Sequence, residues 1–194
     1  SLLSLWSGDS SGYQVAKTQP MKLAAVEGLY EGGNSVGIVG VGVLNPDKET
    51  YNDGKEPFAF RVEIPSLLSL LATRSLDGCV PGIKEIIEGG YEMADGTKAL
   101  SAEEKIEKGK IAIQALSDYR NAKKEKDEVT AETAYRTLQD NVKYFGYGYI
   151  KDVNELVPNV PLNFYAFRVM VILGGYFILF FLVVLFFVYK KDLS

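Results

Sequence analysis

The sequence predicts a mainly α-helical protein with one small β-hairpin, in which a polar domain precedes a single transmembrane helix. The strongest evidence is Val169–Tyr189, a run of 21 residues without a charged side chain. Residues 101–140, by contrast, are dense in Lys and Glu, as is typical of exposed amphipathic helices. In residues 36–64, two segments rich in branched side chains flank a turn-rich segment, which predicts the hairpin.

The first part of the chain is predicted to contain a turn and then a helix. The apolar SLLSLW segment is either a frayed tail or the last turn of an earlier membrane helix, and we favour the second. GDSSGY, residues 8–13, is typical of a turn. Gln19-Pro20 predicts a helix start, because proline suits the first helical turn and disfavours helix in the residue before it. Gly32-Gly33 predicts the end of that helix.

The next elements are the hairpin and an apolar helix. Residues 36–44 and 58–64 are the predicted strands, separated by the turn-forming segment NPDKETYNDGKEP. Pro65 then opens a helix that is rich in leucine. We expect its leucines to be buried against the hairpin or the membrane surface: Leu67, Leu68, Leu70 and Leu71.

Three further helices are predicted before the membrane segment. Pro81 opens the short PGIKEIIEGG helix. Ser101 and Glu104 form a capping-box pattern ahead of a long charged helix, and residues 130–145 form a second amphipathic helix that pairs with it antiparallel. The long helix is expected to bury part of an apolar stripe: Ile106, Ile111, Ile113 and Leu116.

The uncharged run is long enough to cross a membrane and its flanks predict its orientation. At about 1.5 Å per residue it covers roughly 31 Å, the thickness of a hydrocarbon core. Lys190 and Lys191 follow it directly, and such an excess of basic residues marks the cytoplasmic side. Tyr165 and Tyr189 fit the interfacial positions of aromatic side chains. The preceding domain is therefore expected outside the cytoplasm.

Composition excludes several classes of function. The formal charge is −4, and residues from Arg168 onward contribute +2, so residues 1–163 carry about −6. No nucleic-acid partner is expected, because phosphate binding needs a basic surface. Cys79 is alone in the sequence, which excludes an internal disulfide. The chain contains no histidine, so it is a poor candidate for zinc or catalytic-triad chemistry.

Lys22 and Glu27 are the first candidates for a site. They are five positions apart, about 140° around a helix, so they are not the neighbours that form a simple surface ion pair. Either both are solvated charges on an exposed helix, or both approach one ligand across the end of the helix.

Arg168 and Met170 are the second pair of candidates, at the outer end of the membrane helix. An arginine there usually extends to the lipid headgroups and a methionine usually packs. The alternative is that the Met170 thioether binds haem iron axially, as soft ligands can. Positions 168 and 170 are about 200° apart, so the two side chains would approach one haem differently. Arg74, after the apolar helix, is expected to form a cap or a salt bridge.

Four segments in matching order resemble a known family. GDSSGYQVAKTQPMKLAAVEG, ATRSLDG, GYGYIKD and PLNFYAFRVMV are similar to consecutive signatures of subunit I of cytochrome bd ubiquinol oxidase. The resemblance covers nearly the whole chain, from the extracytoplasmic quinol-binding loop (the Q-loop) through the following membrane helix. The charged segment 76–160 resembles the form with an extended Q-loop.

The resemblance implies roles for four residues. In the family, the Lys and Glu of the KLAA-x-E segment serve quinol binding and oxidation, and they match Lys22 and Glu27. The Met of FRVM, matching Met170, is an axial ligand of the low-spin haem b. The nearby Arg, matching Arg168, supports that haem electrostatically. The second haem ligand, a His, belongs to an earlier membrane helix in the family.

The resemblance also implies the function of the whole protein, a respiratory quinol:oxygen oxidoreductase of the bacterial inner membrane. Electrons pass from membrane quinol to the low-spin haem b, and another haem b and haem d elsewhere in the subunit reduce oxygen to water. A second subunit and small accessory subunits complete the complex. Alone, this part of a larger polytopic helical protein is expected to be inactive.

The implied division of the chain has four parts. Residues 1–75 form the N-terminal part of the Q-loop, with the quinol-binding helix and hairpin, and residues 76–163 form its charged C-terminal part, so that residues 1–163 are extracytoplasmic. Residues 164–189 form the transmembrane helix and residues 190–194 a cytoplasmic tail.

One segment departs from the family pattern. After the Glu, the family often has Trp-Glu-Thr, whereas this chain has Tyr30-Glu31-Gly32. The departure leaves the pocket shape open, and with it the choice between ubiquinol and menaquinol. The alternative from another class also stays open: a single-pass, membrane-anchored extracytoplasmic module for binding or assembly, without redox activity.

Overall fold

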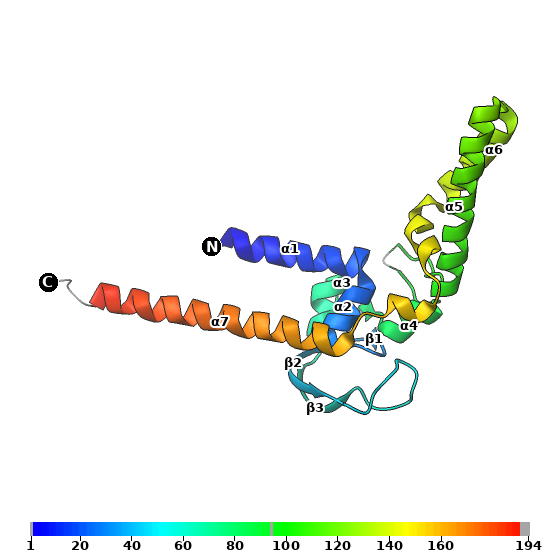
Figure 1. Cartoon of the computed structure of the whole chain (residues 1–194). Helices are drawn as coiled ribbons and strands as arrows, with labels where there is room; N and C mark the ends of the chain where they lie inside the picture. Colours follow the sequence, from blue (N-terminus) through cyan, green and yellow to red (C-terminus); the bar gives the residue numbers. More distant parts are fainter. Residues whose placement is uncertain (1, 94, 191–194) are drawn as a thin grey trace.

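The computed structural model describes residues 2–93 and 95–190, which form a mainly helical chain with small antiparallel sheets (Figure 1). The helices of the described residues are α1 (Leu2–Thr18), α2 (Pro20–Glu27), α3 (Leu67–Thr73), α4 (Ile83–Glu88), α5 (Ala102–Glu125), α6 (Glu128–Asn141) and α7 (Val160–Lys190). The strands are β1 (Gly33–Asn34), β2 (Ile38–Leu44), β3 (Phe58–Ile64) and β4 (Cys79–Val80). Two 3-10 segments, η1 (Val142–Tyr149) and η2 (Val153–Leu156), lead to α7.

The predicted membrane helix corresponds to α7, which is long and apolar enough to span a bilayer and whose most apolar part is not buried by the described chain. The C-terminal end of α7 and the N-terminal end of α1 point to the same side of the molecule (left in Figure 1). The α5–α6 hairpin projects to the opposite side. Lys190 ends α7, whereas Lys191 and the rest of the predicted tail lie outside the described residues.

The predicted hairpin is confirmed as the antiparallel pair β2–β3. Its inward side chains, Val39 and Leu44, form a small core with Phe164 at the start of α7. A second pairing, β1 with β4, was not predicted, because each strand has only two residues. It joins the chain that leaves α2 to the segment that precedes α4.

Two predicted features near the N-terminus were wrong. GDSSGY is not a turn but part of α1, where the Ser11 hydroxyl donates to the Ser7 carbonyl and Asp9 pairs with Arg74 of the segment after α3. That tertiary ion pair, with Nη2 2.6 Å from the carboxylate, also confirms the expected salt bridge of Arg74. The helix from Pro20 ends at Glu27 rather than at Gly32-Gly33, because Gly28 adopts a left-handed conformation (φ 64°).

The leucines of α3 are only partly buried. Leu68 is in the core beneath the hairpin, whereas Leu70 and Leu71 are exposed. The expectation that the leucines are buried is therefore wrong for these two within the described chain. A seven-residue helix cannot direct adjacent leucines into one contact, because neighbouring positions diverge by about 100°.

The antiparallel pairing of α5 and α6 and the Ser101–Glu104 capping box are confirmed, but the predicted stripe is partly wrong. Ile106 is buried, whereas Ile111 is exposed. Small residues fill the contact instead, including Ala112 and Ala115. Gly109 of α5 and Gly148 of η1 let the two backbones touch, and Ile113 packs beside Gly148. Ile111, by contrast, lies about 140° around the helix from Ile106 and so faces away.

Replacing Gly109 with Ala is expected to destabilise the chain by about 1–3 kcal/mol, although Gly→Ala in a helix is normally stabilising. A Cβ at this position would meet backbone atoms of Tyr144 and Gly148, which cannot move aside like a flexible side chain. Thermal unfolding in detergent, followed by circular dichroism, measures the effect. The control is Gly12→Ala in α1, where a Cβ meets nothing within 4 Å. Equal unfolding temperatures for both variants would contradict the close contact.

Candidate functional site

The candidate site forms where the end of α2 meets the start of α7. Glu27 is the last residue of α2, and its Oε2 lies 3.2 Å from Nη2 of Arg168 on α7. Both side chains are largely buried, with relative exposures of 8% for Glu27 and 12% for Arg168. The structure thus joins two of the four predicted site residues in one buried ion pair.

Arg168 also holds three elements together through its guanidinium group. Its Nη1 donates to the carbonyl of Val26 on α2 at 2.8 Å, and its Nη2 donates to the carbonyl of Val39 on β2 at 2.8 Å. The guanidinium carbon lies 3.5 Å from the centre of the Phe164 ring, a cation–π contact. The planar, multiply donating group suits such a junction better than a lysine would.

One donor of this arginine remains without a partner. Nε of Arg168 is buried, and it makes no hydrogen bond among the residues that the structure describes. Buried donors are normally paired, because desolvation without a hydrogen bond is costly. Arg168 therefore has one hydrogen-bond donor that the described residues leave unused.

The charge of Glu27 is set by two opposing effects. Burial raises the pKa of this carboxyl group above its ordinary value, because the charged form loses hydration. The positive charge and hydrogen bond of Arg168 lower it, and burial is the larger effect. A carboxyl group whose pKa is raised in this way is suited to accept and release a proton nearer to neutral pH.

A cavity of about 460 Å³ lies beside this pair. It extends between the end of α2 and the β2–β3 hairpin, and Glu27, Val39 and Phe58 contribute to its walls. Arg61 and Glu63 line it as well. Its volume falls in the range of small-molecule sites, and its lining combines an apolar side with charged groups.

Lys22 is not part of this junction. It is exposed on α2, and within the described chain its side chain forms no ion pair or hydrogen bond with Glu27. The structure therefore separates the two α2 candidates: Glu27 faces α7, whereas Lys22 faces outward.

Met170 lies two residues beyond Arg168 and is exposed, with a relative exposure of 59%. Its thioether is therefore accessible to a ligand outside this chain. No group of three or more Cys, Asp or Glu side chains in residues 2–93 and 95–190 is arranged to hold a metal ion.

The segment Tyr30-Glu31-Gly32 has structural roles. The Gly32 N–H donates to the Glu85 carboxylate of α4 at 2.7 Å, and a Cβ at Gly32 would collide with the backbone of residues 80–82. Tyr30 is buried, with the Lys48 ammonium 4.8 Å from its ring centre. Glycine is required here because two backbone segments touch.

Sequence reasoning missed the residues that complete the junction. Phe164 stacks under Arg168, and the Tyr165 hydroxyl accepts a hydrogen bond from the Leu44 N–H at 3.0 Å. Val39 takes part only through its backbone carbonyl, which any residue type would offer. The one signal in the sequence was the aromatic cluster just before Arg168, which is also typical of a membrane interface.

The fold and site define a class: a chain whose polar domain is fastened by a buried ion pair to a helix long and apolar enough to span a membrane. The profile of the family described as cytochrome bd terminal oxidase subunit I matches residues 1–193, and the chain belongs to this family. It is 30% identical to the cytochrome bd-II ubiquinol oxidase subunit 1 of Escherichia coli (strain K12), in an alignment that covers 92% of this chain. The match covers 33% of that relative, so the chain spans about a third of its length.

Proposed function

We propose that this chain is the quinol-oxidising part of a cytochrome bd-type quinol:oxygen oxidoreductase. The observation that carries the proposal is the buried Glu27–Arg168 pair, which joins α2 to the membrane helix two residues before Met170. Membership of the family and the name of the E. coli relative, a ubiquinol oxidase, support it.

In this proposal, Glu27 and Lys22 act on the quinol. Oxidation of a quinol to a quinone releases two electrons and two protons, so an acceptor for protons must lie beside an acceptor for electrons. Glu27, with its pKa raised by burial, accepts a proton and releases it toward the aqueous side. Lys22 hydrogen-bonds a quinol oxygen and stabilises negative charge that develops on it.

The residues at the start of α7 fit a haem. Met170 would hold the iron through its exposed thioether, together with a His outside this chain. Arg168 would offer its positive charge and the unpartnered Nε–H. When bound, the low-spin haem b supplies the one-electron acceptor.

The setting of this part in the whole protein is also proposed. The whole oxidase carries a further haem b and haem d, acts in the bacterial inner membrane, and assembles with a second subunit and small accessory subunits. Residues 1–163 form the extracytoplasmic Q-loop, divided near residue 75, and residues 164–189 span the membrane. Because the electron acceptor needs ligands from elsewhere, the chain alone is inactive.

The test is a reduced-minus-oxidised absorbance spectrum of the full-length protein carrying Met170→Leu. Leucine keeps the size of the side chain but cannot bind iron, so we expect the low-spin haem b signal to shift or disappear. The control is Met93→Leu, a partly exposed methionine in the loop after α4, which should leave the spectrum unchanged. An unaltered low-spin haem b signal in Met170→Leu would count against ligation by Met170, whereas a full-length protein without any haem b signal would favour a membrane-anchored module without redox activity.

A further inference from the structure

The outer face of the β2–β3 hairpin is apolar and uncovered. Val41 pairs with Val62 and Val43 pairs with Phe60, so the four side chains lie together on one face. Each is more than half exposed, between 51% and 64%. Ile64, at the end of β3, is 56% exposed. We call these five residues the apolar hairpin face.

The apolar hairpin face is unusual because the polar side chains of the hairpin lie on its inner side and not on this exposed side. Two-stranded antiparallel sheets normally bury one face and present polar side chains on the other. Here the charged side chains of β3, Arg61 and Glu63, lie on the inner side, where they pair with each other at 3.4 Å and line the cavity. The apolar hairpin face has no share in the lining of that cavity.

Two β-bulges create this arrangement. The register shifts between Val39 and Val41, where Gly40 is the extra residue, and between Val43 and Leu44, where Ala59 is the extra residue. Each bulge reverses the side to which the following residues point. Val39 and Leu44 consequently face Phe164, while Val41 and Val43 between them face outward.

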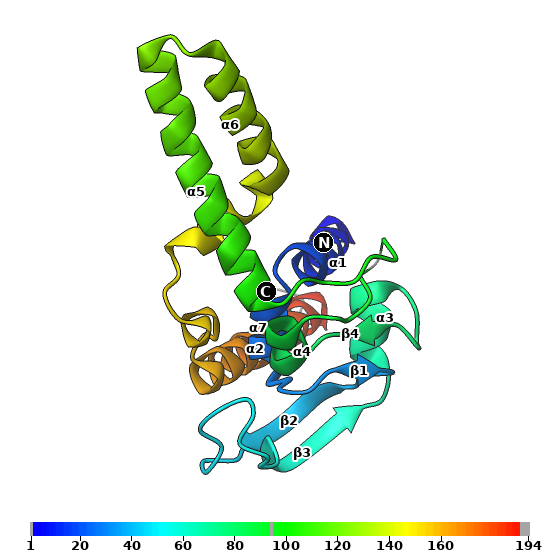
Figure 2. The same cartoon turned by 90° about the vertical axis from the view of Figure 1, so that its right-hand side faces the viewer.

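The position of the hairpin relates this face to the membrane. The β2 backbone is hydrogen-bonded to Tyr165 and Arg168, which directly precede the uncharged run of α7. The inward side chains pack on Phe164 in the first turns of α7, and the rest of the described chain leaves the outward face uncovered. Figure 2, which views α7 nearly along its axis, shows β2 and β3 broadside, so the sheet lies across that axis.

We propose that the apolar hairpin face rests in the interfacial layer of the phospholipid bilayer and fastens the polar domain to the membrane surface. The hairpin lies beside the first residues of the uncharged run, which is where the headgroup region meets the hydrocarbon core. The headgroup region extends several Å beyond that core. Branched and aromatic side chains without any charge suit this layer. Continuity with α7 favours lipid as the occupant over a soluble partner. The proposal depends on α7 spanning a bilayer and is independent of quinol oxidation.

The test is photocrosslinking in the full-length protein, reconstituted in nanodiscs of phosphatidylethanolamine and phosphatidylglycerol. Phe60 is replaced by p-benzoylphenylalanine, which keeps an aromatic ring at this position. Irradiation should give an adduct whose mass increase equals one phospholipid. The matched control places p-benzoylphenylalanine at Tyr51, in the loop between β2 and β3. This variant should give several-fold less lipid adduct.

A second measurement covers the case in which the bulky residue disturbs the fold. A nitroxide on Val62→Cys should be more accessible to oxygen than to a water-soluble nickel complex, whereas one on Lys55→Cys should show the reverse order. An adduct between position 60 and another protein segment, or equal accessibility at positions 62 and 55, would overturn the proposal.

Discussion

Replacing Glu27 with Gln in the full-length protein is expected to lower quinol oxidation by about 10²–10⁴-fold, the usual contribution of a positioned proton acceptor. Glutamine keeps the shape of the side chain and can still accept a hydrogen bond from Arg168, but it cannot take a proton from the quinol. Haem absorbance should stay intact, because the fold around Arg168 is retained. Steady-state oxygen consumption with a soluble quinol measures the effect.

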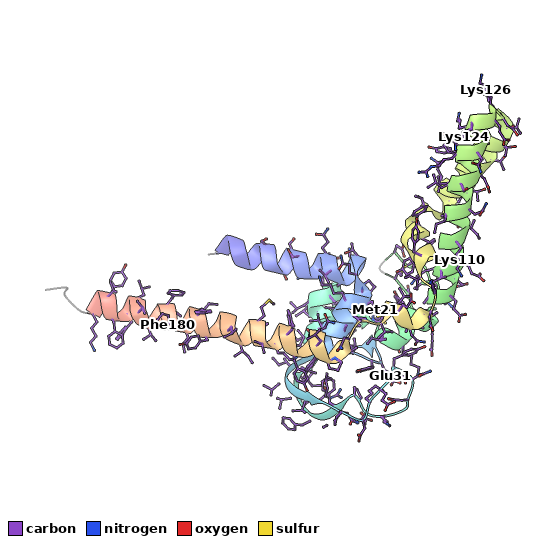
Figure 3. All side chains as sticks on the ribbon, viewed as in Figure 1. Met21, Glu31, Lys110, Lys124, Lys126 and Phe180 are labelled. Carbon is purple, nitrogen blue, oxygen red and sulfur yellow. The ribbon has the colours of Figure 1, made fainter. Side chains whose placement is uncertain are left out.

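The control for this variant is Glu132→Gln on α6. Glu132 pairs with Arg136 at 2.9 Å, and its side chain is 59% exposed. Figure 3 shows the projecting hairpin, marked by Lys110, Lys124 and Lys126, away from Met21 of α2. Turnover should be nearly unchanged in Glu132→Gln; unchanged turnover in Glu27→Gln as well would remove Glu27 from the mechanism.

Arg168→Leu is expected to destabilise the junction between the polar domain and the membrane helix by about 3–5 kcal/mol, the cost of leaving one partner of a buried ion pair uncompensated. The loss includes hydrogen bonds to the carbonyls of Val26 and Val39 as well as the pair with Glu27. Denaturant unfolding in detergent, with limited proteolysis to detect release of the domain, measures it.

Two further variants separate the effect of a buried unpaired charge from the loss of an ordinary surface ion pair. Arg136→Leu removes an exposed pair with Glu132 on α6, and it should cost no more than about 1 kcal/mol. The double variant Glu27→Leu with Arg168→Leu should recover part of the stability, because no unpaired buried charge remains. Equal losses for Arg168→Leu and Arg136→Leu would contradict the importance of the junction.

The pH dependence of stability has a definite sign. The pKa of Glu27 is raised on folding, so between its ordinary value of 4.5 and the folded-state pKa the native state binds more protons than the unfolded state. The contribution of Glu27 is therefore fully present at acid pH and is lost as pH rises through this window. Because Arg168 lowers this pKa, Arg168→Leu should extend the loss to higher pH. The same unfolding experiment at several pH values measures the shift.

Local patterns were sufficient for the elements whose structure depends on neighbouring residues. The uncharged run predicted α7, the capping box predicted the start of α5, and the branched segments predicted β2 and β3. Local patterns failed where another segment intervened. GDSSGY is helical beside a tertiary ion pair, and alanines rather than Ile111 fill the buried face of α5.

For the site, the resemblance to a family identified Lys22, Glu27, Arg168 and Met170, and membership of that family is now shown. The roles of these residues are predictions. The structure adds that Glu27 and Arg168 touch, that Lys22 is outside the junction, and that Met170 is open.

The sequence by itself therefore determined a membrane helix, a hairpin and a charged helical pair, because hydrophobic period, turn chemistry and caps act over a few residues. Only the tertiary structure decided which charges meet. Glu27 and Arg168 are separated by 141 positions in the chain, and spacing carries no information about such a contact. A buried carboxylate must find a partner wherever folding brings one, and here the first turns of the membrane helix provide it.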